Sequence, residues 1–289
     1  MNPTTLPDPI TDDMVRLGYV ALSLLTDHTN LATVQRHGPA ALLNLHHDPA
    51  SVLLRARRAL ATAEGLGARA VLPGDPQWPA QLHDLPANAI PLCLWVQGPR
   101  MLPEATAQSV YVTGSRAATA YGTHLAQQLA HDLTDRYGWT VASGAAFGID
   151  AAALRGAAVT RHSMPPLIVS GSGLDNPHPT AHTDLYAYAA AEGLVVTAEP
   201  PGATLTRDRH HRRLQLAAAL TSGVLIVETT TRGGAMTLAE HARRMTRPVA
   251  AVPGPVTSTH SAGCHALIRD RHARLVGTAT EAHDALTPR

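Results

Sequence analysis

Two glycine-rich turns, centred on Gly114 and Gly144, constrain the fold of this chain more than any other feature. The first follows the β-branched apolar run at 109–113, and the second follows the run at 139–142. Each turn leads into a stretch with helical spacing of apolar residues. A strand that ends in a glycine turn and continues into a helix is typical of open α/β sheets, where backbone N–H groups at the turn can meet a phosphate.

Strand patterns alternate with helical patterns through the second half of the chain. The expected strands span residues 109–113, 139–142, 166–170, 194–197, 223–227 and 248–252. Long helical stretches separate most of them, which predicts βαβ units and a doubly wound, mostly parallel sheet. The loops at the carboxyl ends of parallel strands share one edge of a sheet, so they would form a single ligand surface.

Composition divides the chain into three segments. Residues 1–66 carry apolar residues at helical spacing and predict a small N-terminal helical domain. Residues 67–108 are proline-rich and predict a connector with a short strand at 92–96, anchored on the core by Trp78 and Trp95. Residues 109–289 hold the alternating pattern, and we expect them to form a Rossmann-like α/β domain.

The composition also excludes several classes of protein. An apolar fraction of 45% argues against a mainly disordered chain, and a net charge of +1 gives no general attraction for a polyanion. With 3% aromatic residues and a single phenylalanine, Phe147, a base-stacking platform is hard to build. Nucleic-acid binding would therefore depend mostly on phosphate contacts.

We expect neither a metal site nor a disulfide framework nor a membrane segment. Cys93 and Cys264 form no CxxC pair, and the 17 histidines lack cysteine or carboxylate partners at metal-ligand spacing. The start of the chain shows no signal-peptide pattern, and no apolar run is long enough for a bilayer. These patterns predict a cytoplasmic protein in a reducing compartment, without a cofactor.

The first turn supplies three candidate phosphate ligands. Gly114 has no Cβ and lets a ligand approach the backbone, while Ser115 and Arg116 add a hydroxyl group and a planar cation. A tight turn with a surface arginine explains the same residues equally well.

The second turn repeats the arrangement with Ser143 and Gly144. Gly148 and Asp150 then open the helix that follows. Asp150 could orient a ligand hydroxyl, although a cap at the helix N-terminus is the simpler interpretation.

A basic run at residues 207–213 is a sharper signal. It lies at the expected start of a helix, where the positive end of the helix dipole makes clustered cations unfavourable. An anion bound by Arg209, Arg212 and Arg213 would relieve this repulsion. The basic run at 241–247 instead ends a helix, where cations suit the dipole, and we interpret it as a solvated face.

Taken in chain order, these segments resemble the DNA-processing protein A (DprA/Smf) family over roughly residues 68–286. The matching motifs are Leu72–Pro79 with Leu94–Gly98, Gly114–Arg116 with Tyr121-Gly122, Ser143–Asp150, Gly171–Asp175 with Pro177–Pro179, Glu199–Gly202, Val227-Glu228, Val252–Gly254, and Ser261–Gly263 with Leu267-Ile268. The resemblance implies an extended Rossmann fold that forms a homodimer, binds single-stranded DNA without strong sequence preference and assists loading of a RecA-type recombinase. It implies no catalysis.

The resemblance also assigns roles to the residues of the two turns. Arg116 would be a phosphate ligand, with backbone groups of Gly114, Ser115, Ser143 and Gly144 lining the same pocket.

The facing wall of that pocket departs from the family pattern. The family's Arg-Asn-Arg signature falls on Arg213-Leu214-Gln215, which keeps one cation of two. The neighbouring Arg207, Arg209 and Arg212 could compensate for the loss. The winged-helix tail that is common in the family is not recognised after the last matching motif.

The segment beginning at Arg232 leaves a second interpretation open. The family's Ser-Gly-x-x-x-Thr-Ala loop falls on 233–239, and we expect Arg232 and Gly234 to contact phosphate. The same segment resembles the Pro-Gly-Gly-x-Gly-Thr-x-x-Glu motif of LOG-type nucleotide phosphoribohydrolases. In such an enzyme Glu240 would act on the ribose and Arg213 would bind the phosphate. A third alternative is a nucleotide-binding sensor that uses the same loops.

Overall fold

A nine-stranded sheet forms the centre of the computed structural model, which describes residues 12–25, 30–160 and 164–287. The strand order across the sheet is β1-β2-β6-β5-β4-β3-β7-β8-β9. The strands are β1 (Ala68–Val71), β2 (Leu94–Gln97), β3 (Ser109–Thr113), β4 (Thr140–Ser143), β5 (Leu167–Val169), β6 (Leu194–Thr197), β7 (Gly223–Ile226), β8 (Val249–Ala251) and β9 (Arg274–Leu275). The seven neighbouring strands β6-β5-β4-β3-β7-β8-β9 are parallel to one another. β2 pairs antiparallel with β6, and β1 pairs antiparallel with β2.

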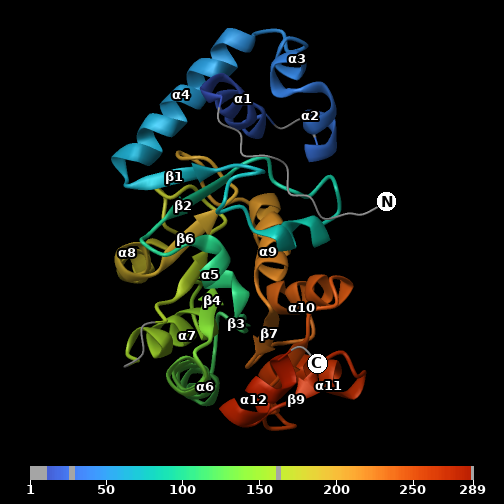
Figure 1. Cartoon of the computed structure of the whole chain (residues 1–289). Helices are drawn as coiled ribbons and strands as arrows, with labels where there is room; N and C mark the ends of the chain where they lie inside the picture. Colours follow the sequence, from blue (N-terminus) through green and yellow to red (C-terminus); the bar gives the residue numbers. More distant parts are fainter. Residues whose placement is uncertain (1–11, 26–29, 161–163, 288–289) are drawn as a thin grey trace.

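Helices cover both faces of this sheet (Figure 1). The helices α6, α7 and α8 lie on one face, and α9 and α10 lie on the other. Their bounds, with those of the shorter helices beside them, are α5 (Leu102–Ala107), α6 (Ala120–Tyr137), α7 (Ile149–Ala158), α8 (Thr183–Glu192), α9 (Arg207–Leu220), α10 (Gly234–Arg244), α11 (Ala262–Arg269) and α12 (Ala279–Leu286). Short 3₁₀ helices occur at η1 (Ala80–Asp84), η2 (Thr180–His182) and η3 (Thr259–Ser261).

The period of two along each strand explains how both faces are covered. In β3, Val110 and Val112 pack with residues of α6, α7 and α12, whereas Tyr111 between them packs with residues of α9 and α10. All three side chains are fully buried. A strand with apolar side chains on both faces needs a helical layer on each side, as parallel sheets generally do.

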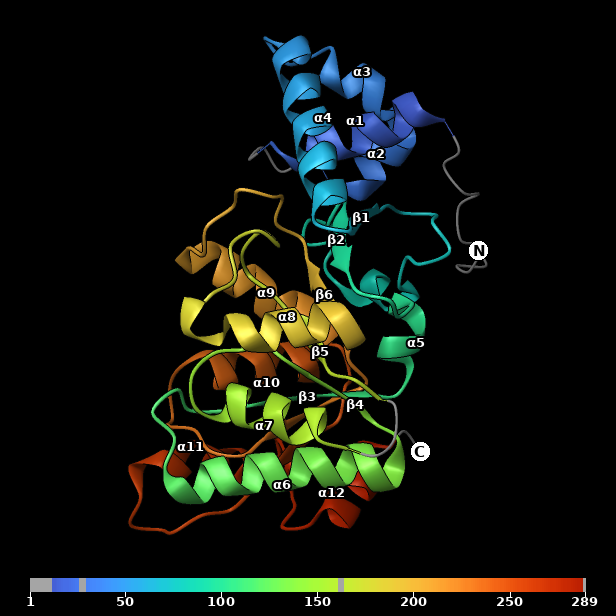
Figure 2. The same cartoon turned by 90° about the vertical axis from the view of Figure 1, so that its left-hand side faces the viewer.

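The N-terminal helices gather beyond the β1 edge of the sheet (Figure 2). They are α1 (Asp13–Ser23), α2 (Leu31–His37), α3 (Pro39–Leu43) and α4 (Pro49–Gly65). Their buried residues, such as Val20 and Ala56, share a hydrophobic cluster with Trp95 of β2 and Leu185 of α8. The helical segment therefore packs directly on the end of the sheet.

The predicted fold class is confirmed, and each of the six expected strands of the α/β region forms within one residue of its expected bounds. Trp78 and Trp95 are 4% and 0% exposed, in agreement with their predicted anchoring role. The expected strand at 92–96 forms as β2, whereas β1 and β9 were not predicted. The domain boundaries after residues 66 and 108 stay a prediction, since the segment 67–108 contributes β1 and β2 to the common sheet.

Asp150 fastens the second glycine turn to the neighbouring strand. Its carboxylate accepts hydrogen bonds from Thr113 Oγ1 at 2.7 Å, the Gly144 N–H at 3.3 Å and the Ala146 N–H at 3.4 Å. The residue is 3% exposed, so these donors have little access to water. Gly148 precedes α7 with a φ of +74°, a backbone conformation that residues other than glycine rarely adopt.

The Asp150 contacts generate a stability prediction. Asp150→Ala leaves a buried hydroxyl and two backbone donors without their acceptor, and it should lower the free energy of unfolding by about 2–4 kcal/mol. Asp184→Ala is the matched control, because Asp184 is exposed and lies 3.9 Å from Arg155. The control should cost under about 1 kcal/mol. Urea unfolding midpoints measure both, and equal shifts would refute the fastening role of Asp150.

Candidate functional site

The candidate site lies where the strand order reverses. β3 is followed along the chain by its neighbour β4, but its other neighbour in the sheet is β7. The loops that leave β3 and β7 therefore diverge, and a cleft of about 650 Å³ opens between them. Open α/β sheets bind ligands at such a switch point. The cleft is lined by Thr113–Ala117, Ala146, Asp150, Arg207, His210, His211, Arg213, Leu214, Thr229, Thr230, Arg232–Ala235 and Thr237.

Two glycines bring the segments around the cleft close together. A Cβ on Gly114 would overlap the carbonyl oxygen of Glu228, in the loop after β7. The Ser115 N–H donates to that same oxygen at 2.6 Å. A Cβ on Gly144 would overlap the guanidinium of Arg213. Glycine at these two positions therefore joins the first turn to the β7 loop and lets an arginine side chain pass over the second turn.

Arg213 forms the floor of the cleft with a buried guanidinium. The residue is 8% exposed, and Nη1 donates to the Gly144 carbonyl oxygen at 3.0 Å. In the described part of the chain, no carboxylate lies within 4.0 Å of this group. Its Nε and the nearby Tyr111 hydroxyl are buried with no hydrogen-bond partner among the described residues. Burial disfavours this charge and the Asp150 carboxylate favours it from beyond 4.0 Å, so an anion in direct contact would stabilise the guanidinium further.

Three exposed arginines also line the cleft. Arg116 follows the first turn, Arg207 begins α9 and Arg232 precedes α10. Among residues 12–25, 30–160 and 164–287, none of the three has a carboxylate partner. The carboxylate of Asp150 also borders the cleft, but it is occupied by its three hydrogen bonds. The excess of cations makes the cleft attractive to anions.

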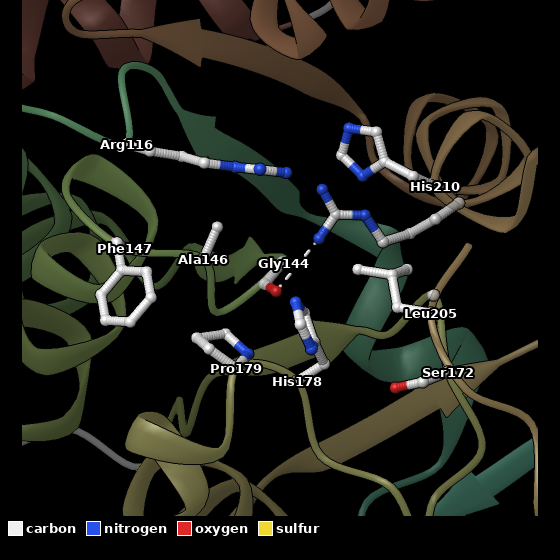
Figure 3. Close-up of a pocket in the computed structure, with 11 residues that line it drawn as sticks. Arg116, Gly144, Ala146, Phe147, Ser172, His178, Pro179, Leu205 and His210 are labelled. Carbon is white, nitrogen blue, oxygen red and sulfur yellow. Dashed lines mark hydrogen bonds between the residues drawn. The ribbon is translucent and has the colours of Figure 1, made fainter. Parts of the chain in front are cut away.

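His210 places an imidazole among these arginines. Figure 3 shows its ring and the Arg116 side chain pointing toward each other across the pocket. Partial burial, followed by the positive charges of Arg213, Arg116 and His211, lowers the pKa of His210 to about 4. The ring is therefore neutral at pH 7.

The N-terminus of α10 completes the cleft. Gly233, Gly234 and Ala235 all line it. The first N–H groups of a helix have no partner within the helix, and the helix dipole favours an anion beside them. Gly233 has φ of +124°, which a side chain would rarely tolerate. This end of α10 therefore adds backbone donors to the arginines of the cleft.

A smaller pocket adjoins the cleft at Arg116, Ala146, His210 and Arg213, which line both (Figure 3). Its other walls include the apolar or aromatic side chains of Phe147, Pro179, Leu205 and His178. The buried Ser172 adds a hydroxyl group. Apolar walls beside a cationic cleft suit a ligand with a phosphate and an uncharged part.

The structure gives the predicted residues of the second turn internal roles. Ser143 is buried, and its hydroxyl donates to the Val112 carbonyl oxygen at 2.8 Å. Asp150 holds the turn as described, and Gly148 lies too close to the Ser115 and Arg116 carbonyl groups to carry a Cβ. Ser143 and Gly148 support the cleft from behind, whereas Gly114, Ser115, Arg116, Asp150, Arg213, Arg232 and Gly234 border it directly.

Arg209 and Arg212 do not join the cleft. Arg209 Nε donates to Glu199 Oε2 at 2.9 Å, and Arg212 Nη2 donates to Glu199 Oε1 at 2.9 Å. Glu199 follows β6 and is 6% exposed, so it needs these counter-charges. Of the three neighbours expected to compensate for the lost family cation, Arg207 alone borders the cleft.

The altered family signature divides between two sides of α9. Leu214 lines the cleft. Gln215 instead borders a separate pocket with Leu85 and Met245. The position where the family has its second arginine therefore does not face the cleft in this structure.

Glu240 lies outside the cleft. It forms ion pairs with Arg243 at 2.9 Å and Arg244 at 3.0 Å. The hydrogen bond from Arg244 and the charges of both arginines hold the pKa of Glu240 below its usual range. A phosphoribohydrolase needs this carboxylate beside a bound ribose, so the geometry does not support that alternative.

Reasoning from the sequence missed His210 and Tyr111 as parts of the site. His210 lies inside the basic run at 207–213 and is the fourth residue of α9. Its place near the start of a helix, among arginines, could have marked it as a candidate phosphate ligand. Tyr111 reads as an ordinary strand residue, and nothing in the sequence marks its buried hydroxyl.

Two further expectations can be compared with the described residues. Within them, no group of three histidine, cysteine, aspartate or glutamate side chains is arranged to hold a metal ion. No helix in the same residues is long and apolar enough to span a bilayer.

Comparison with known proteins matches residues 69–287 to the family described as DNA recombination-mediator protein A. A putative DNA processing protein DprA of Mycobacterium tuberculosis is 42% identical over 212 residues, which cover 70% of this chain and 54% of the relative. The protein Smf of Escherichia coli is 32% identical over 201 residues, 69% of this chain and 52% of that protein. The chain thus spans about half the length of the curated relatives it matches.

Solved structures agree on the fold. DNA processing protein A of Streptococcus pneumoniae superimposes with a TM-score of 0.78 at 24% identity, covering 97% of this chain and 100% of that one. DNA processing protein A of Helicobacter pylori, described for its single-stranded DNA binding mode, gives a TM-score of 0.67 at 22% identity, with 76% and 95% covered. The family match runs from β1 to the end of α12, and the chain therefore belongs to the DNA recombination-mediator protein A family.

Proposed function

We propose that this protein binds the backbone phosphates of single-stranded DNA in the cleft between the β3 and β7 loops. The observation that carries the proposal is the buried guanidinium of Arg213, which has no carboxylate partner in the described residues. A phosphate beside Arg116, Arg213 and the first turn of α10 would supply a counter-charge in direct contact and accept charge-assisted hydrogen bonds.

A strand of DNA suits the cleft better than a single nucleotide does. Arg116, Arg207 and Arg232 come from three separate segments around the cleft, and all are exposed. Successive phosphates can each meet one of them, whereas a mononucleotide presents one phosphate group. The adjoining pocket at Phe147 could take a base or sugar, which would also account for its apolar walls.

Family membership supports the remaining parts of the proposal. The protein would act without catalysis, hold single-stranded DNA in the cytoplasm and assist its transfer to a RecA-type recombinase. It would do so as a homodimer. Glu240, the carboxylate needed by the enzymatic alternative, is occupied by two arginines away from the cleft.

Arg116→Ala tests the phosphate contact. Arg116 is exposed, so its removal should leave the fold intact and weaken oligo-dT binding about tenfold at low salt, or about 1.4 kcal/mol. Loss of one phosphate contact should also reduce the slope of log K against log salt by about 0.7. Fluorescence anisotropy over a salt series measures both.

Arg212→Ala is the matched control for this experiment. It removes another largely exposed arginine, but one that pairs with Glu199. The control should keep the slope of the unmodified protein. Equal slopes for Arg116→Ala and the unmodified protein would contradict the proposed contact.

A competition experiment separates DNA binding from nucleotide sensing. Unlabelled oligo-dT should displace a labelled oligo-dT at concentrations at least about tenfold below those of any nucleoside monophosphate or cyclic nucleotide, because several phosphates are contacted at once. A mononucleotide that competes better than oligo-dT would favour the sensor.

A further inference from the structure

His210 occupies the junction between the cleft and the adjoining pocket. It lines both cavities, together with Arg116 and Arg213. Its Nε2 lies 3.2 Å from the point where a Cβ on Gly234 would stand, so the ring edge meets the first residue of α10. The ring itself is in the first turns of α9. A phosphate that reaches Arg116 and Arg213 would therefore also approach His210.

Positive groups flank His210 on its own helix and on the loops after β3 and β7. Its own helix contributes Arg207, His211 and Arg213, the β3 loop contributes Arg116, and the β7 loop contributes Arg232. His178 borders the adjoining pocket, and Asp150 is the carboxylate that borders the cleft.

The Asp150 carboxylate accepts hydrogen bonds from three neutral donors, and it is not among the groups that shift the pKa of His210. The causes that hold the pKa of His210 near 4 are burial first and then Arg213, Arg116 and His211, with no carboxylate among them. The N-termini of α9 and α10 further disfavour the charged ring. His210 is therefore a neutral group in a place where only an added negative charge would favour its protonation.

We infer that His210 is a proton-dependent ligand of the phosphate: the site takes up a proton on His210 when a phosphate enters the cleft. The inference rests on the proposed function, since it deepens the description of the same site. In the protonated state the ring donates a hydrogen bond to the phosphate and becomes a further cation beside Arg116 and Arg213.

The direction of the pH dependence follows from this coupling. An anion within hydrogen-bond distance raises the pKa of a neighbouring histidine by about 1–3 units. The complex then binds more protons than the free protein, so affinity rises as pH falls. With a rise of about 2 units, binding should tighten about tenfold between pH 7 and pH 5, with an uptake of about 0.8 proton at pH 5.

Oligo-dT binding between pH 5 and pH 7 tests the inference. Thymine has no group that titrates in this range, so the probe does not contribute to the pH dependence. Calorimetry in two buffers of different ionisation enthalpy counts the protons taken up. His210→Asn should bind within about threefold of the unmodified protein at pH 7, where the ring is largely neutral, and should lose most of the gain at pH 5.

Matched variants separate His210 from the general effect of histidine protonation. His124→Asn removes an exposed imidazole of α6 that borders neither cavity, and it should keep both the tenfold gain and the proton uptake. His210→Gln serves as a second variant at the site if His210→Asn lowers the unfolding midpoint. If either folded His210 variant keeps the full gain at pH 5, the inference is wrong.

A second measurement distinguishes failure of the inference from failure of the proposed function. NMR titration of the His210 ring with and without saturating sulfate, an anion that stays ionised over this range, reports its protonation directly. A raised pKa with sulfate supports the inference even if oligo-dT does not bind, in which case the DNA-binding proposal fails alone. An unchanged pKa overturns the inference even if oligo-dT binds well.

Discussion

The contact of the Arg213 guanidinium with the Gly144 carbonyl determines how the cleft is built. It places a permanent cation inside the protein, where a charge is tolerated only with strong hydrogen bonds or a counter-charge. The turn must lack a Cβ at Gly144 for the side chain to pass. Asp150 then holds this turn against Thr113 of β3, so the floor of the cleft is fixed to the middle of the sheet. The buried polar groups left over, at Arg213 Nε and the Tyr111 hydroxyl, lie beneath the place where a ligand would enter.

Three carboxylates near the site have structural partners among the described residues. Glu199 pairs with Arg209 and Arg212 at one side. Glu228 accepts hydrogen bonds from the N–H and the hydroxyl of Thr119 at 2.9 and 2.7 Å and so secures the start of α6. Asp150 serves the second turn. None of these three carboxylates pairs with an arginine that borders the cleft, so the cleft arginines can each contact an external anion.

Much of the fold could be predicted because strand and helix periods alternate clearly from Ser109 onward. β1 escaped prediction because it is short and only partly buried, and β9 because its two residues are exposed. The glycine turns revealed the location of the site, since a parallel sheet gathers such loops at one edge. The ion pairing of Arg209 and Arg212 could not be predicted from local sequence, because their partner Glu199 follows a different strand. His210 was overlooked because its environment depends on Arg116, far away in the chain.

The commitment of Arg209 and Arg212 to Glu199 has a kinetic consequence. The chain carries a net charge of +1, and this ion-paired group adds little to its field at a distance. A cleft lined by charges of one sign focuses the electric field and speeds the arrival of an oppositely charged ligand. We expect steering of a polyanion to come from the exposed Arg116, Arg207 and Arg232 at the cleft, while the buried Arg213 acts only after contact. Salt would then slow association through these three arginines and not through the paired Arg209 and Arg212.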